Sequence, residues 1–389
     1  MDEKSLKPQL RFKGFTEAWE QRKLADTSPL RGGYAFQSNK FEKDGVPVVK
    51  ISNILPTGEV GGDFDCYNEL PQDDNFVLPD GAAVLAMSGA TTGKVSILNN
   101  PKKIKVYQNQ RVGYFTQKKD VDYAFIKTLV KSNLFTDQLR SVLVAGAQPN
   151  VSSKDIDNFE FYFSKSIKEQ SKIGGLFTNL DNLITLHQRK LDKLSNVKKA
   201  LLEKMFPKND SDVPEIRFKG FTEAWEQRKL SEIASYLPSN LSASNTDING
   251  RFDLYDANGV IGKTNAMPQK ESYITIIKDG SGVGRVRMLP PQTCYIGTMG
   301  GIFSKATNNI DFIFHTLSNF DFSTHIIGAT IPHVYFSDYG NDEIGVPYEA
   351  EQKMIGKFFS NLDNLITLHQ RKLEKLKNIK KACLEKMFV

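Results

Sequence analysis

Two glycine-rich turns contain the residues whose types and spacing could bind phosphate. They are GATTGK at 89–94 and DGSGVGR at 279–285. Backbone N–H groups and hydroxyls of such turns can approach a phosphate, while Arg, Lys and amide side chains can reach base edges. Because tight turns between strands have the same composition, the turns alone favour a structural role over a nucleic-acid contact.

GATTGK also raises an enzymatic alternative, because it resembles the nucleotide-binding Walker loop. Three residues separate its glycines where four are needed, and Val95 stands where the Walker loop has a magnesium-binding Ser or Thr. The glycines near residue 280 do not form the dinucleotide-binding fingerprint either. The sequence therefore argues against an ATPase, and it contains no recognisable nuclease site.

The histidines and cysteines form no catalytic or metal-binding pattern. The three cysteines lie far apart, and none of the five histidines belongs to a metal-ligand pair or a Ser/His/Asp arrangement. We therefore predict no metal site, no catalytic residue and no disulfide scaffold. For His333, in ATIPHVYF, a role in the core or in a turn is favoured over contact with a ligand.

Acidic residues are absent from a window at each of the two turns, although the excess of positive charge as a whole lies on the long repeat. The chain has a net charge of +6, with 40% hydrophobic and 25% charged residues, which is typical of a globular protein and excludes a disordered or fibrous one. Residues 81–119 contain seven bases and no acid, and residues 280–310 contain three bases and no acid. Such windows suit a polyanionic partner. The sequence predicts neither a signal peptide nor a membrane span, so the cytoplasm is the expected compartment.

Two internal repeats organise the chain around these windows. RFKGFTEAWEQRKL stands at 11–24 and again, unchanged, at 217–230, and the segment 177–206 returns at 359–388 with 25 of 30 positions identical. The blocks between the repeats share little beyond glycine-rich turns. The chain is therefore one framework carrying two different inserts rather than a solenoid. The tryptophans of the short repeat, Trp19 and Trp225, are expected to be packing anchors.

The long repeat predicts two helices that pair as an antiparallel coiled coil. Seam residues alternate three and four positions apart, and the first helix is expected from about Lys168 to Phe206. Polar seam residues, which include Lys198 and Lys380, set the register at a cost in stability. Neither helix can bury its stripe alone, and its near-identical twin is the simplest partner. The predicted seam residues are Phe177, Leu180, Ile184, His187, Leu191, Leu194, Leu201, Met205, Phe359, Leu362, Ile366, His369, Leu373, Leu376 and Met387.

The two blocks predict globules of mixed α and β structure. Helical spacing appears at 122–143. Short β-branched stretches bounded by glycine or proline turns predict strands at 46–52, 82–87, 94–98, 272–278 and 284–289. The expected fold class is α+β: two mixed α/β domains separated by two long helices that form the coiled coil, related by a pseudo-twofold axis.

In this order, the segments resemble the DNA-specificity (S) subunit of type I restriction-modification systems over essentially the whole chain. GGYAFQSNKF (32–41), SGATTGKV (88–95), NQRVGYF (109–115) and AGAQPNVS (145–152) look like the first target-recognition domain of that family. KDGSGVGRV (278–286), GTMGG (297–301) and GATIPHV (328–334) look like the second. The resemblance implies target-recognition domains at 1–166 and 211–347, and helical spacers at 167–210 and 348–389.

The resemblance implies a protein without catalysis. Each domain would read one half of a bipartite, asymmetric DNA site. The coiled coil would set the gap and dock two methyltransferase subunits, which restriction-translocase subunits would join. S-adenosylmethionine, ATP and Mg would serve these partners, and this chain would hold no cofactor. The alternative is a free-standing, sequence-specific DNA-binding regulator, which would bind its site tightly without partners.

The resemblance also implies which residues contact double-stranded DNA. Arg111, Arg285 and Arg287 are the expected guanine readers, each worth roughly 1–3 kcal/mol of discrimination if bidentate. The second domain departs from the usual G-A-T-x-G string. The expected contacts are Gly89, Ala90, Thr91, Thr92, Gly93, Lys94, Asn109, Gln110, Arg111, Gln148, Pro149, Asn150, Lys278, Ser281, Arg285, Arg287, Thr298, Pro332 and His333.

Overall fold

The structure is a computed structural model that describes residues 6–143, 150–208 and 211–389. The chain divides into two compact units, one formed by Met1–Leu186 with Leu373–Val389 and the other by His187–Lys372. Two long helices, α5 (Ile167–Met205) and α9 (Glu349–Met387), each contribute residues to both units. The predicted first helix is thus confirmed to within a residue at each end. Among the described residues, no helix is both long enough and apolar enough to cross a membrane.

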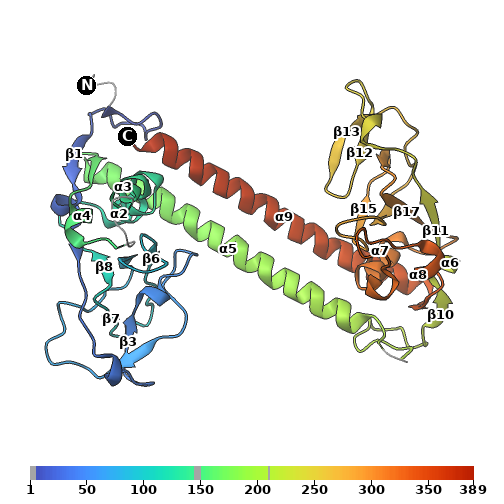
Figure 1. Cartoon of the computed structure of the whole chain (residues 1–389), viewed down its shortest axis with the longest axis horizontal. Coiled ribbons are helices and arrows are strands. Elements are labelled where there is room, and N and C mark those ends of the chain that lie inside the picture. The colour runs from blue at the N-terminus through green and yellow to red at the C-terminus, as the bar shows by residue number, and fades with distance from the viewer. Residues whose placement is uncertain (1–5, 144–149, 209–210) are drawn as a thin grey trace. The chain divides into compact units, whose positions relative to one another are not determined.

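The first unit contains a four-stranded sheet and two smaller sheets (Figure 1). Its strands are β1 (Glu20–Lys23), β2 (Leu30–Arg31), β3 (Val46–Val49), β4 (Asp65–Tyr67), β5 (Ala83–Ala86), β6 (Val95–Ile97), β7 (Tyr107–Gln108), β8 (Val112–Phe115) and β9 (Glu160–Phe163). The antiparallel four-stranded sheet has the order β2-β8-β5-β6. The three-stranded sheet has the order β4-β3-β7, with β3 and β7 parallel, and β1 pairs with β9.

The second unit repeats this topology strand for strand. Its strands are β10 (Glu226–Lys229), β11 (Ala234–Pro238), β12 (Phe252–Tyr255), β13 (Val260–Thr264), β14 (Tyr273–Ile277), β15 (Val286–Leu289), β16 (Thr293–Tyr295), β17 (Met299–Ser304) and β18 (Glu343–Val346). The sheets have the orders β11-β17-β14-β15, β13-β12-β16 and β10-β18, with β12 and β16 parallel. Two blocks with little common sequence therefore form one fold, which confirms the predicted fold class of two mixed α/β domains. The five stretches predicted as strands each contain one.

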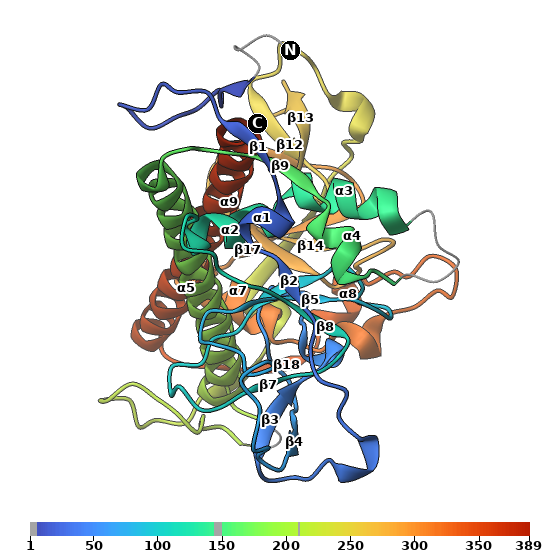
Figure 2. The ribbon, with the colours of Figure 1, turned by 90° about the vertical axis from the view of Figure 1, so that its left-hand side faces the viewer.

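Short helices cover the sheets of each unit. They are α1 (Leu24–Thr27), α2 (Tyr123–Val130), α3 (Asn133–Leu143) and α4 (Ser153–Asp157) in the first unit, and α6 (Leu230–Ile233), α7 (Ile310–Ser318) and α8 (Phe336–Tyr339) in the second. The helical pattern at 122–143 forms two helices rather than one. Ser132 Oγ donates to the Leu129 carbonyl at 2.6 Å, at the point where α2 ends. Figures 1 and 2 show α2 beside α5, with sheet β4-β3-β7 at the far end of the first unit.

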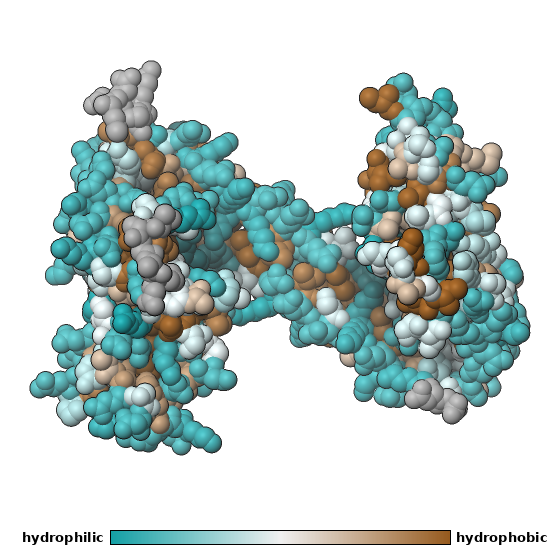
Figure 3. All heavy atoms as spheres, in the orientation of Figure 1, coloured by the Kyte–Doolittle hydropathy of each residue, from teal (hydrophilic) through white to brown (hydrophobic). Residues whose placement is uncertain are grey.

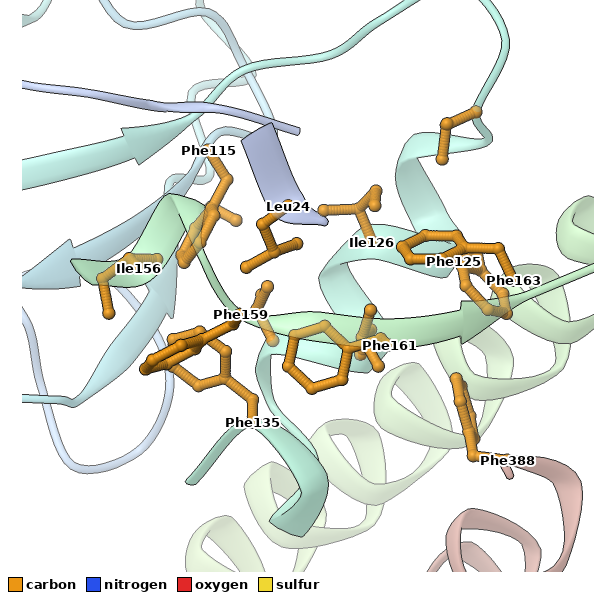
Figure 4. Packing of buried hydrophobic residues seen from close by; sticks show 14 of the residues in the cluster. Leu24, Phe115, Phe125, Ile126, Phe135, Ile156, Phe159, Phe161, Phe163 and Phe388 are labelled. Atoms are coloured by element: carbon orange, nitrogen blue, oxygen red, sulfur yellow. The ribbon is translucent and has the colours of Figure 1, made fainter. Parts of the chain in front are cut away.

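Aromatic side chains dominate the core of the first unit (Figure 4). The ring centroids of Trp19 and Phe388, which follows α9, are 6.1 Å apart. In the second unit the ring centroids of Trp225 and Phe206, which follows α5, are 5.9 Å apart. Both tryptophans are 2% exposed, which confirms their role as packing anchors. The end of one long helix is thus packed into the core of each unit.

A buried ion pair joins each copy of the short repeat to a long helix. Arg11 Nε and Nη2 donate to the carboxylate of Glu169, in the first turn of α5, at 2.6 and 2.8 Å. Arg217 Nε and Nη2 donate to Glu351, in the first turn of α9, both at 2.7 Å. Both glutamate side chains are fully buried, so loss of either arginine would leave an uncompensated charge.

Each copy of the short repeat is also preceded by a residue that binds the end of the other long helix. Leu10 N donates to the Lys386 carbonyl of α9 at 2.8 Å, and Ile216 N donates to the Lys204 carbonyl of α5 at 2.9 Å. The two copies therefore share these contacts with the long helices, which gives a physical reason for their common sequence. They differ at the tryptophans, because Trp19 Nε1 donates to Glu169 at 3.3 Å and Trp225 Nε1 has no partner among the described residues.

Ion pairs fix the antiparallel register of α5 and α9 within each unit. In the first unit Asp181 of α5 binds Lys380 of α9 at 2.6 Å and Lys131 at 3.0 Å. Although burial opposes it, Lys131 and Lys380 keep the pKa of Asp181 below its usual value. In the second unit Lys198 of α5 forms the equivalent pair with Asp363 of α9. These are the positions at which lysine interrupts the apolar seam.

A histidine pair occupies the seam in the second unit. The Nδ1 atoms of His187 and His369 are 2.8 Å apart. Because Lys198 pairs with Asp363 further along, residue numbers fall along α9 as they rise along α5, so the helices are antiparallel. The residues predicted for the seam are all buried or half-buried.

Candidate nucleic-acid interface

In the first domain, the turn between β5 and β6 is built by main-chain hydrogen bonds. Gly93 N donates to the Ala86 carbonyl at 2.8 Å, and Thr92 N and Lys94 N donate to the carbonyls of Gly89 and Thr91, both at 3.0 Å. Gly93 has a φ of +86°, and a Cβ there would lie 2.4 Å from Leu139 Cδ2. The conformation therefore requires glycine, and it leaves Gly89, Ala90 and Lys94 exposed.

Met87 brings the three predicted contact segments of this domain together. Its N–H donates to the Arg111 carbonyl, and its carbonyl accepts from Val151 N, both at 3.0 Å. Segments 89–94, 109–111 and the residue Asn150 thus lie next to one another. Gln110, Arg111 and Asn150 are exposed, whereas Asn109 is half-buried and its N–H donates to the Val49 carbonyl at 3.0 Å. The predicted contacts Gln148 and Pro149 lie outside the described residues.

The turn between β14 and β15 of the second domain has the same hydrogen bonds. Gly284 N donates to the Ile277 carbonyl at 2.9 Å, and Val283 N and Arg285 N donate to the carbonyls of Gly280 and Gly282 at 3.2 and 3.0 Å. Gly280, Gly282 and Gly284 all have positive φ. The departure from the G-A-T-x-G string therefore leaves the hydrogen bonds of the turn unchanged, whereas Gly282 has a positive φ that Thr91, at the equivalent position, does not have.

Lys278 occupies the place of Met87. Its N–H donates to the Thr298 carbonyl and its carbonyl accepts from Val334 N, both at 3.0 Å. Gly280 N also donates to the Pro332 carbonyl at 2.9 Å. The structure thus brings together five of the predicted contacts of this domain, which are Lys278, Ser281, Thr298, Pro332 and His333.

The side chains of the two predicted guanine readers of the second domain contact main-chain carbonyls of a neighbouring turn. Arg285 Nη2 donates to the Ala257 carbonyl, in the turn between β12 and β13. Arg287 Nη2 lies 3.4 Å from the carbonyls of Ala257 and Asn258. Both guanidinium groups keep further N–H donors that these contacts do not use.

Two residues of the interface are absent from the sequence prediction. Asp279 places Oδ1 2.8 Å from His333 Nδ1 and Oδ2 3.4 Å from Lys278 Nζ. Its signal in the sequence is an acid directly before a window without acids. In the first domain Tyr34 is 44% exposed, stacks on Phe76 with ring centroids 4.6 Å apart, and pairs with Asn109. It belongs to the GGYAFQSNKF string.

No metal-binding cluster accompanies these loops. Across residues 6–143, 150–208 and 211–389, no group of three or more His, Cys, Asp or Glu side chains could hold a metal ion. Cys66, Cys294 and Cys383 are free thiols. The exposed side chains of the two sets of loops include hydroxyls, amides and cations, which can contact phosphates and base edges.

Comparisons with known proteins agree with this geometry. A family model described as "Type I restriction modification DNA specificity domain" matches residues 16–196 and 222–378. The chain is 22% identical over 400 residues to a putative type I restriction enzyme MjaX specificity subunit of Methanocaldococcus jannaschii, covering 94% of this chain and 91% of that protein. It is 26% identical over 195 residues to the MjaVIII specificity subunit of the same organism, covering 48% of this chain and 45% of that protein.

The fold is similar to that of a solved structure. The crystal structure of a type I restriction-modification system S subunit from M. genitalium matches with a TM-score of 0.73 and 15% sequence identity. The match covers 98% of this chain and 99% of that one.

Proposed function

Because the chain belongs to the family of type I restriction-modification DNA specificity proteins, we propose that each of its two domains reads one half of a bipartite, asymmetric DNA site. The observation that carries the proposal is one loop framework built twice with different side chains. Met87, Arg111 and Val151 of the first domain take the places of Lys278, Thr298 and Val334 in the second. Equal frameworks favour one kind of ligand, and unequal side chains favour different base sequences.

The charge of the loops supports DNA as that ligand. The acid-free window 81–119 contains the first glycine turn with β5 and β6, and the acid-free window 280–310 contains β15 and the part of the second turn that follows Asp279. Lys94, Arg111 and Arg285, which are exposed, and Lys278, which is half-buried, would contact phosphates or base edges in the major groove.

The long helices are proposed to set the gap between the half-sites. Each has 39 residues without a break, a length of about 58 Å at 1.5 Å per residue. Paired helices resist bending better than a loop of the same length, so the spacing of the two recognition domains would be fixed by the helices rather than by a flexible linker.

Two equivalent apolar patches on the helices are proposed to dock two methyltransferase subunits. Leu183, Leu186 and Ile379 are exposed in the first unit. Their equivalents Leu365, Leu368 and Val197 are exposed in the second. Figure 3 shows apolar areas on the long helices among hydrophilic ones. Exposed apolar side chains gathered on a helix favour association with another protein.

Catalysis is assigned to the partners. Methyltransferase subunits would use S-adenosylmethionine, and restriction-translocase subunits would use ATP and Mg. The chain itself would contribute base recognition and docking, and the complex would act on DNA in the cytoplasm. The free-standing regulator is the weaker candidate, because a regulator has no need of two equivalent exposed patches on its spacer.

The test maps modified adenines across a genome in cells that contain the partner subunits, once with this chain and once without it. A recombinant in which residues 25–176 come from another specificity subunit should change one half of the modified sequence and leave the other unchanged. Changes in both halves would contradict independent reading. Tight, site-specific binding by the isolated chain, with no effect on methylation, would favour the regulator.

A further inference from the structure

Three charged or titratable side chains meet at the centre of the second domain's loops, where the first domain has uncharged ones. Lys278, Asp279 and His333 take the places of Met87, Ser88 and Asn150. The correspondence follows from the main chain, because Val334 N donates to the Lys278 carbonyl as Val151 N donates to the Met87 carbonyl.

Asp279 is an unexpected member of a surface that would face phosphates. A carboxylate there repels DNA unless its charge is compensated. Its Oδ2 lies 3.4 Å from Lys278 Nζ, and its Oδ1 lies 2.8 Å from His333 Nδ1. Lys278 therefore compensates the charge of the carboxylate.

The main chain on both sides of His333 is fixed. His333 and Ile327 exchange two hydrogen bonds, with His333 N to Ile327 O at 2.8 Å and Ile327 N to His333 O at 3.0 Å. On the other side, Gly280 N donates to the Pro332 carbonyl at 2.9 Å. The side chain therefore keeps only rotation about its own bonds, and the contact with Asp279 selects one orientation.

The chemistry of the pair determines what the ring offers to a ligand. A carboxylate only accepts, so Nδ1 must carry the hydrogen, and Nε2 of the neutral ring is then an acceptor. The His333 side chain is 33% exposed. Within the part of the chain that the structure describes, no hydrogen bond involves Nε2.

We propose that Asp279 is a positioning residue that holds His333 with Nε2 directed at the amino group of a base, adenine N6 or cytosine N4, in the half-site of the second domain. The proposal rests on the proposed function, since it assumes that these loops face DNA. In the major groove only adenine and cytosine present an amino donor. Asp279 thereby contributes to specificity without contacting DNA.

The test compares complete complexes that contain the wild-type chain, Asp279→Asn or the control Asp338→Asn. Asp338 is exposed on α8, so its substitution removes one charge from the same domain and leaves Lys278, Asp279 and His333 unchanged. Binding is measured on duplexes that carry each base pair in turn along both half-sites. Asp279→Asn should lose on the order of tenfold discrimination at one position of the second half-site. The control and the first half-site should remain unchanged.

A second variant keeps the test decisive if Asp279→Asn folds poorly. His333→Phe removes both ring nitrogens and leaves the carboxylate paired with Lys278. It should lose discrimination at the same single position. Full retention of discrimination by both variants would overturn the proposal. So would a uniform loss of affinity for all sequences with a weaker salt dependence, which indicates a phosphate contact.

A reading role and a structural role differ in which affinities change. Loss of a base contact lowers the affinity for one base pair at one position, whereas a loop that folds poorly lowers the affinity for every sequence. A wild-type complex without any sequence preference would overturn the proposed function and this proposal together.

Discussion

His315 is fully buried on α7, and neither of its ring nitrogens has a hydrogen-bond partner among the described residues. Burial, with a smaller effect of Lys198, lowers its pKa to about 3. At the equivalent position in α2 the first domain has Thr128, whose Oγ1 donates to the Ala124 carbonyl at 2.9 Å. The second domain therefore contains a buried, neutral histidine at a position where the first domain has a threonine.

The lowered pKa of His315 predicts a loss of stability in acid. Below about pH 6.5 the unfolded chain takes up a proton that the folded chain refuses, so the free energy of unfolding falls with the pH until about pH 3. This contribution reaches at most about 1.4 kcal/mol per pH unit. Denaturant unfolding at several pH values should show a weaker pH dependence for His315→Thr.

His187 sets the baseline for that comparison. Burial lowers the pKa of His187, and His369, Lys372 and Lys190 lower it further. His187 therefore also makes the free energy of unfolding fall in acid, and this contribution remains in His315→Thr. Parallel pH profiles for wild type and His315→Thr would contradict the assignment to His315, whatever the variant's stability at neutral pH.

Of the three arginines predicted to read guanine, Arg111 is the one for which the structure shows no contact of the side chain with a main-chain carbonyl among the described residues. Its carbonyl is fixed by Met87 N, and its side chain is exposed. Arg111→Ala in the complete complex should cost roughly 1–3 kcal/mol of discrimination at one base pair of the first half-site. Binding to single-base variants of the site measures this cost. The control Lys119→Ala removes an exposed charge outside the loops, and equal effects of the two variants would indicate a general electrostatic contribution.

Part of the interface could be predicted from single residues. Gly89, Gly93, Gly280 and Gly284 mark their turns because positive φ favours glycine, and the structure places them there. The role of Asp279 could not be predicted, because its partner His333 is distant in sequence and only the fold joins them. The contacts of Arg285 and Arg287 with the carbonyl of Ala257 depend equally on tertiary structure.

At the scale of the elements, the pair Lys198–Asp363 fixes the register of α5 on α9. Removing one partner leaves a half-buried charge, so Asp363→Leu should lower the free energy of unfolding by roughly 1–3 kcal/mol. The double variant Lys198→Leu with Asp363→Leu should recover most of the loss, because an apolar pair suits the seam. Denaturant unfolding measures the stability of the wild type, of Asp363→Leu and of the double variant. A double variant as unstable as the single one would argue against a role of the pair in the register.

The two apolar patches predict the stoichiometry of the complex. Leu186→Glu or Leu368→Glu should each remove one methyltransferase subunit, and the double variant should remove both, since an interface does not accept an unpaired carboxylate. Co-purification with quantified subunits measures this. Leu134→Glu, at an exposed apolar position on α3, is the control. Loss of both subunits on a single substitution would contradict two independent docking sites.

The long helices were predictable because the predicted seam, residues 177–205, repeats over about eight turns. The break between α2 and α3 was not predictable, because the helical pattern continues through 122–143. Ser132 binds the Leu129 carbonyl through both its N–H and its hydroxyl where α2 ends. The strands were found but predicted too long, because β-branched runs continue into turns that tertiary contacts define.

At the scale of the whole molecule, duplication is the dominant feature. Nine strands recur in the same order, although the blocks differ in sequence and the second is shorter. Sequence comparison of the blocks could not show this, because hydrogen-bond topology tolerates exchange of most side chains on a sheet.

The proposed spacer role predicts a measurable change in the target. One heptad inserted into both α5 and α9 at the level of His187 and His369 adds about 10 Å of helix. The gap between the half-sites should widen by about three base pairs, with both half-sites unchanged. Mapping of modified adenines reads both quantities. An unchanged gap would contradict the role of the helices in spacing.

The loops of both domains are held by hydrogen bonds between main-chain atoms. Exposed side chains such as Ala90, Gln110, Ser281 and Thr298 can therefore be exchanged without breaking those bonds. Point mutations at these positions have little cost in folding, so under the proposed function the target sequence can change one base at a time through intermediates that still fold.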